Sequence, residues 1–253
     1  MQVAFARIDA WMPALVLAVL MILAWLIGLR ARRRFPKGAE PLENLLDEAA
    51  LALVGLLLAF TFAMAIGKHD QRRTLFVADT NAIGDFYTCA SLLPEPTRAK
   101  LQGVIREYAE MRLAAGLRPE GEEDFERLLQ QSERLHAEMT ALVSQAVNAG
   151  TPVAVPLVNT LNNLTSSHAA RIAAHRDRLP VSILGLLFIA AAVSAALLGR
   201  QPAATSGARV SLWAYILIVT LVVYVILDLN QPHRGLITVS QEPLERLIAT
   251  MGK

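Results

Sequence analysis

Four long apolar stretches separate the polar parts of this chain, at 11–29, 49–67, 181–199 and 210–229. The second stretch reads AALALVGLLLAFTFAMAIG and contains no charged side chain. A helix of about 20 mainly apolar residues is long enough to cross a bilayer. The pattern therefore predicts four membrane helices, and the helical periodicity along the chain gives no sign of strands.

The first apolar stretch has to be compared with a secretory signal peptide. The stretch is long, no small-residue cleavage site follows it, and its basic cluster at 30–37 lies after it instead of before it. A membrane helix is therefore the better interpretation, with Trp11 and Trp25 as anchors at the membrane interface.

The segment 68–180 has the composition of a soluble domain, with 13 Lys or Arg against 14 Asp or Glu. The second membrane helix is predicted to continue into this segment as one rod, up to the break at Pro94 and Pro96. Further glycine and proline breaks divide the remainder into predicted helices at 97–116, 122–148 and 157–179.

The predicted fold is an all-α membrane protein with a helical soluble domain between membrane helices 2 and 3. Residues 1–67 are expected to hold membrane helices 1 and 2, joined by a polar connection at 35–48, and residues 68–180 to form the soluble bundle. Residues 181–229 are expected to hold membrane helices 3 and 4. The C-terminal tail 230–253 follows, with a short amphipathic helix at 243–251. An even number of crossings places both termini and the bundle on one side of the membrane.

Which side the bundle faces stays open. The short loop at 30–48 carries five basic residues, which favours the cytoplasm for this loop and the outside for the bundle. Basic residues also flank helices 2 and 3 on the bundle side, and these favour the opposite orientation.

Composition excludes several classes of function. The chain is 54% hydrophobic and 18% charged with a net charge of +2, and no basic tract is interleaved with aromatic residues, so nucleic acid is not an expected partner. Cys89 is the single cysteine. No catalytic triad, nucleophile elbow or phosphate loop is present, so no enzyme activity is expected. The histidines lack the spacing of metal ligands, so no metal and no other cofactor is predicted.

Two helical faces carry charge close to the membrane. One stripe on 157–179 begins with leucines and ends with His168, Arg171, His175 and Arg178, while Asp79 lies in an otherwise apolar stripe of the rod. Asp79 and His168 are equally far from the membrane ends of their helices, which places them at the same height if the helices are antiparallel. A buried carboxylate needs a positively charged or hydrogen-bonding partner. We therefore predict that Asp79 pairs with His168 or Arg171. The stripe is either a structural ion-pair layer or the basic lining of an anion path.

An apolar row follows the second membrane helix. Leu56, Phe60 and Met64 recur every four residues, and Leu58, Phe62 and Ile66 form a second row. Such rows pack against neighbouring helices, or they form a hydrophobic constriction around a symmetry axis. Asp228, near the end of the last membrane helix, is either a functional intramembrane carboxylate or a residue of the interface.

Three motifs resemble the bacterial DUF4239 family, also called bestrophin-like. They are FVADTNAIG at 76–84 followed by LLP at 92–94, the Arg-x-x-x-x-Arg-x-Arg-Leu-Pro pattern at 171–180, and LDLNQPHRGLITVS at 227–240. The resemblance covers nearly the whole chain in the same order. Asp79 stands where the family has Glu, and Asn230 where it has Asp, which puts in doubt any role that depends on the second acid.

The resemblance implies a pentameric anion channel in a bacterial inner membrane, whose partners are the lipid bilayer, copies of itself and small ions. It implies that helix 2 lines the pore, which makes Leu56, Phe60 and Met64 candidates for the pore neck, and it favours a cytoplasmic bundle. The tail holds only Glu242 and Glu245 after Asp228, so no calcium gating is expected. The alternative function is a membrane-anchored sensor or interaction protein whose helical bundle binds a ligand or partner.

Overall fold

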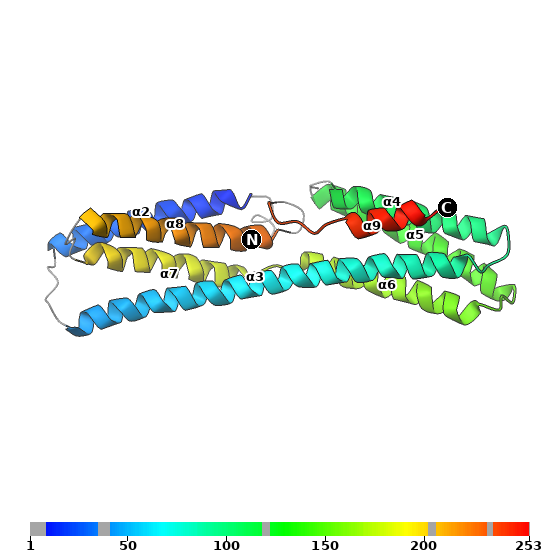
Figure 1. Cartoon of the computed structure of the whole chain (residues 1–253), viewed down its shortest axis with the longest axis horizontal. Helices are drawn as coiled ribbons and strands as arrows, with labels where there is room; N and C mark the ends of the chain where they lie inside the picture. Colours follow the sequence, from blue (N-terminus) through cyan, green and yellow to red (C-terminus); the bar gives the residue numbers. More distant parts are fainter. Residues whose placement is uncertain (1–8, 35–40, 118–121, 202–205, 232–234, 253) are drawn as a thin grey trace. The chain divides into compact units, whose positions relative to one another are not determined.

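The computed structural model describes residues 9–34, 41–117, 122–201, 206–231 and 235–252. Its helices are α2 (Trp11–Arg34), α3 (Pro41–Ala90), α4 (Thr97–Leu117), α5 (Glu122–Asn148), α6 (Ala154–Arg176), α7 (Val181–Arg200), α8 (Ser206–Leu229) and α9 (Glu242–Thr250), shown in Figure 1. No strand occurs in these ranges. The predicted all-α class is confirmed, and four helical segments are long and apolar enough to cross a membrane.

The chain divides into two compact units. Unit 1 comprises Met1–Lys68 and Arg178–Ile237, and unit 2 comprises His69–Asp177 and Thr238–Lys253. Helix α3 contributes its first part to unit 1 and its second part to unit 2. The segment expected to be a separate tail divides between the units, because its end packs against the core of unit 2.

In unit 1, helix α2 packs against both α7 and α8 (Figure 1). Two glycines allow the α2–α7 approach: a Cβ added to Gly28 would meet the carbonyl oxygen of Ala196, and one added to Gly199 would meet the carbonyl oxygen of Trp25. Small residues that let backbones approach are typical of membrane helix pairs. Large apolar side chains such as Leu15, Leu186 and Ile189 remain exposed on the outside of this unit, as expected for a surface in lipid.

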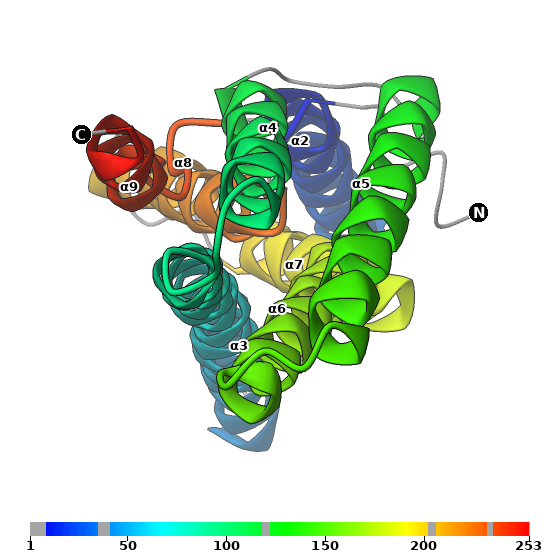
Figure 2. The same cartoon turned by 90° about the vertical axis from the view of Figure 1, so that its right-hand side faces the viewer.

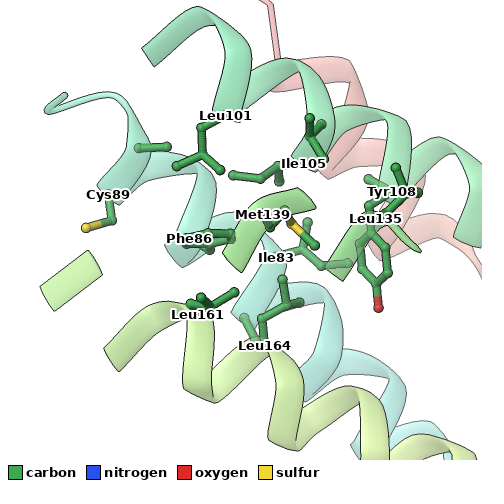
Figure 3. Close-up of a cluster of buried hydrophobic side chains, with 14 of the residues drawn as sticks. Ile83, Phe86, Cys89, Leu101, Ile105, Tyr108, Leu135, Met139, Leu161 and Leu164 are labelled. Atoms are coloured by element: carbon green, nitrogen blue, oxygen red, sulfur yellow. The ribbon is translucent and has the colours of Figure 1, made fainter. Parts of the chain in front are cut away.

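In unit 2, α4, α5, α6 and the second part of α3 surround an apolar core (Figure 2). Ile83, Phe86, Leu101, Ile105 and Met139 lie in this core and point toward one another (Figure 3). The amphipathic helix α9 packs against α4 and adds further apolar residues to the same core.

The tail also has a polar attachment to unit 2. The guanidinium of Arg106 on α4 donates a hydrogen bond to the carbonyl oxygen of Met251, at 3.1 Å. Met251 itself is buried, as is Leu244 at the other end of α9. The end of the chain is thus an integral part of the bundle.

Several boundaries differ from those predicted. Helix α3 already begins at Pro41, within the expected polar connection at 35–48, because proline is favoured in the first turn of a helix; residues 35–40 lie outside the described ranges. Helix α2 continues past its apolar stretch to Arg34, where arginines suit the negative end of the helix dipole. Helix α6 ends at Arg176 instead of 179, because Pro180 disfavours helical backbone in the residue before it.

Candidate functional site

A buried polar network joins all four helices of the bundle in unit 2. Its members come from every helix that surrounds the core: Asp79 on α3, Tyr108 and Arg112 on α4, Ser132 and His136 on α5, and Ser167, His168 and Arg171 on α6. Tyr108 connects this network to the apolar core, because its ring is one of the fully buried side chains in Figure 3 and its hydroxyl points away from the leucines.

Asp79 is the negative centre of the network, with only 1% of its surface exposed. Its Oδ2 accepts hydrogen bonds from Arg112 Nη2 at 2.7 Å and from Arg171 Nη1 at 3.1 Å. Its Oδ1 lies 3.3 Å from Ser167 Oγ, whose single proton is shared with the carbonyl oxygen of Leu164 at 3.0 Å. A carboxylate buried this deeply costs several kcal/mol unless it is paired, on the order of the desolvation penalty of an ion, and here both oxygens have partners.

Arg112 links Asp79 to His168. While Nη2 binds the carboxylate, Nη1 lies 2.7 Å from the hydroxyl of Tyr108 and 2.5 Å from Nδ1 of His168. The guanidinium has only donors, so Nδ1 of His168 must carry a lone pair. The proton of the imidazole is then on Nε2, which lies 3.1 Å from Ser132 Oγ and donates to it.

The surroundings of the network shift the pKa values of its two histidines and its tyrosine. Burial, the charge of Arg112 and the neighbouring His136 lower the pKa of His168 to about 4, against an opposing effect of Asp79. Burial and the charge of Arg112 also lower the pKa of His136. Burial raises the pKa of Tyr108 above its usual range. At neutral pH both imidazoles and the phenol are therefore uncharged, and the only charges of the network are one carboxylate and two guanidiniums.

His136 is the least satisfied member. Both of its ring nitrogens are buried, and neither has a hydrogen-bond partner among the described residues. Its ring centre lies 5.0 Å from that of His168 and 5.1 Å from that of Tyr108, with which it makes an edge-to-face contact. Two imidazoles and a phenol thus form an aromatic group beside the ion pairs.

The structure brings some of the predicted residues together and not others. Asp79 and Arg171 form a direct ion pair, and Arg171 also lies over the ring of Phe76, 5.3 Å from its centre. His168 reaches Asp79 only through Arg112. Arg178, the last residue of the predicted basic stripe, falls in unit 1, so that stripe does not stay within one unit, and His175 is half-buried in unit 2.

Sequence analysis missed the side chains contributed by α4 and α5. Tyr108 and Arg112 are four residues apart, as are Ser132 and His136, so each pair shares one helical face. The available signal was a polar pair on an otherwise apolar helical face. On α4, the buried side chains of Leu101 and Ile105 make up the rest of that face.

Asp228 has a structural role. It is 1% exposed, and its carboxylate accepts hydrogen bonds from the backbone N–H groups of Leu236 and Ile237 at 3.0 Å. Gly235 precedes them with a φ of +114°, and a Cβ there would collide with the carboxylate. Asn230 similarly accepts a hydrogen bond from the N–H of Leu179, at 2.8 Å. The motif at the end of α8 thus anchors the following turn within unit 1.

The apolar rows on α3 differ in their surroundings. Leu56, Phe60 and Met64 are 51%, 64% and 40% exposed. Leu58 and Phe62 of the second row instead pack against the apolar core of unit 1, whereas Ile66, the third residue of that row, is 38% exposed. No group of three or more His, Cys, Asp or Glu side chains that could hold a metal ion occurs among the described residues.

Comparison with known protein families finds that the model of the bestrophin-like domain matches residues 18–244. Two crystal structures of a bacterial bestrophin homologue from Klebsiella pneumoniae, each with one substitution, share the fold. The first has a TM-score of 0.65 at 14% identity and covers 97% of this chain and 96% of that chain. The second has a TM-score of 0.65 at 14% identity and covers 94% and 95%.

A third structure, described as that of a membrane protein, has a TM-score of 0.59 at 14% identity and covers 94% of each chain. No curated protein matches this chain. At this level of identity the solved structures show the fold: an all-helical membrane protein, in agreement with the element order described above.

Proposed function

This chain belongs to the bestrophin-like family, and we propose that it forms a homopentameric channel for small anions in a bacterial inner membrane. In this proposal the first part of α3 lines the pore, and Leu56, Phe60 and Met64 form its neck. The bundle of unit 2 would then be the soluble domain of each subunit.

One observation carries the proposal: α3 presents a row of large apolar side chains that its own subunit does not cover. Phe60 is 64% exposed, whereas Phe62 on the neighbouring face packs into unit 1. Such a row, repeated around a symmetry axis, forms a ring of apolar side chains. A ring of this kind controls ion passage because a narrow apolar constriction loses its water.

A preference for anions is supported by the family resemblance and by the local charge of the buried network. The buried network contains two guanidiniums, of Arg112 and Arg171, against the single carboxylate of Asp79. This excess of positive charge is local to the network, since unit 2 as a whole carries 13 Lys or Arg against 16 Asp or Glu.

The first test is the oligomeric state of the purified full chain in mild detergent or lipid nanodiscs. We expect native mass spectrometry to give the mass of five copies, and end-on particle images to show five-fold symmetry. A monomer or dimer under these conditions would contradict a shared axial pore.

The second test uses two phenylalanines of one helix. Phe60→Ala is expected to raise the anion conductance of the reconstituted protein several-fold and to weaken its ion selectivity, because a smaller apolar side chain lowers the cost of wetting the constriction. Phe62→Ala is the matched control, since Phe62 packs within unit 1, and it should leave the permeability ratio unchanged. Equal effects of both substitutions on selectivity would remove Phe60 from the neck.

A second candidate function is a membrane-anchored sensor whose bundle binds a ligand or partner. The polar network favours this sensor function, since all members of the network lie in unit 2. A buried group of ionisable side chains costs stability, and specificity or function is a reason for a protein to keep such a group. A chain that is monomeric and passes no ions after reconstitution would favour this function over the channel.

A further inference from the structure

We propose that His168 and its neighbours form a proton-operated lock in the helical bundle. When His168 takes up a proton, its bond with Arg112 on α4 is lost, and the packing of α6 against α5 loosens. This device goes beyond the proposed channel and does not depend on ion conduction, because every group it uses lies in unit 2.

The contact between Arg112 and His168 exists only while the imidazole is neutral. Arg112 Nη1 lies 2.5 Å from His168 Nδ1, and both the guanidinium and a protonated imidazole have only donors. A proton on Nδ1 would place two N–H donors and two positive charges face to face. The guanidinium cannot release its own proton in a protein, so the two side chains must separate.

The groups around His168 offer little compensation for an added charge. Facing it are Asp79 from α3, Tyr108 and Arg112 from α4, and His136 from α5, while Arg171 lies on its own helix. Both oxygens of Asp79 already accept hydrogen bonds. Protonation would therefore give three positive charges around one carboxylate.

His136 adds to the same effect. Its ring lies 5.0 Å from that of His168, and its buried nitrogens have no hydrogen-bond partner among the described residues. The closed bundle is the arrangement of the present structure, in which α6 is packed in place. In this closed bundle a protonated His136 would have neither water nor an acceptor. Once α6 moves away, both imidazoles gain water, so the open bundle binds protons more tightly than the closed one.

The direction of the pH dependence follows from this difference. The pKa of His168 is about 4 in the closed bundle, against an ordinary value of about 6.5 in water. Between these values the open state carries more protons, so the closed state is fully stable above about pH 6.5 and loses stability as the pH falls toward 4. From about pH 7.5 to about pH 5, the ratio of open to closed bundle rises roughly 30-fold.

The chain contains its own reporter of this opening. Cys89 is the single cysteine of the sequence, and it is buried in the core of unit 2 (Figure 3). Its labelling by a dipyridyl disulfide, which reacts in both acidic and neutral solution, measures how often the bundle opens. The rate is divided at each pH by that of the denatured chain, which removes the pH dependence of the thiol itself.

In the full chain in nanodiscs, this normalised rate is expected to rise roughly 30-fold from about pH 7.5 to about pH 5, and to fall again when the pH is restored. His168→Asn keeps an acceptor for Arg112 but cannot be protonated, and it should reduce the rise to less than about threefold. His175→Asn, on the same helix, is the matched control and should keep the full rise.

A second measurement needs no variant. Hydrogen–deuterium exchange at the imidazole C2 position, read by mass spectrometry, reports the titration of each histidine in the wild-type chain, and His168 is expected to titrate below about pH 5. A flat labelling profile in the wild type, a full rise in His168→Asn, or titration of His168 at its ordinary value would each overturn the lock.

Discussion

Replacement of Asp79 by alanine is expected to lower the free energy of unfolding of the helical bundle by about 3–5 kcal/mol. The substitution leaves the guanidinium of Arg112, which is 7% exposed, without its carboxylate. Arg171 loses the same partner but is 19% exposed, so its long side chain has a route to water. The buried charge of Arg112 therefore dominates the loss.

The measurement is a urea titration in which exposure of Cys89 to a thiol reagent reports the unfolding of unit 2, where it is buried. Asp85→Ala is the matched control, because Asp85 is an exposed acid on the same helix, and it should change the midpoint little. The double variant Asp79→Leu with Arg112→Met should recover most of the loss, since apolar residues often replace a buried ion pair without cost. A loss below about 1 kcal/mol for Asp79→Ala would mean that Asp79 is not a central charge of a buried network.

The second large effect is expected where α2 and α7 cross. Gly199→Val should destabilise unit 1 by about 3 kcal/mol or more, because overpacked sites cost this much when the neighbours cannot move. A Cβ at Gly199 would meet the carbonyl oxygen of Trp25 and would lie 3.1 Å from the Cα of Gly28. These are backbone atoms, so no change of rotamer relieves the collision.

Tryptophan fluorescence during thermal unfolding measures this effect, since Trp11, Trp25 and Trp213 all belong to unit 1. The rings of Trp25 and Trp213 lie 6.5 Å apart and should separate when α2 moves. Gly185→Val on the same helix is the matched control, because no atom lies within 4 Å of a Cβ built there. Equal shifts in the two variants would show that the α2–α7 contact is not tight.

The two probes also separate the predictions from each other. Asp79→Ala acts in unit 2 and should change the reactivity of Cys89 first, whereas Gly199→Val should change the tryptophan signal first. When both signals are followed in one urea titration, a change at the same urea concentration would mean that the two units unfold together.

The sequence by itself determined the class of fold, because the signals for it are local. The length of an apolar run is set by the thickness of a bilayer, and helix ends follow from proline, glycine and charge close by in the chain. The same signals identified Asp79 as an acid on a buried face and Phe60 as part of an apolar row.

Only the tertiary structure decided which side chains meet. A face of a helix is visible in the sequence, but its partner depends on the rotation and relative height of helices far apart in the chain. Tyr108, Arg112 and Ser132 were therefore not found, although their polar atoms lie within hydrogen-bond distance of His168. For the same reason Asp228 was ambiguous: its carboxylate binds the backbone of a turn several residues later, and the path of a backbone turn is set by packing that residue types do not record.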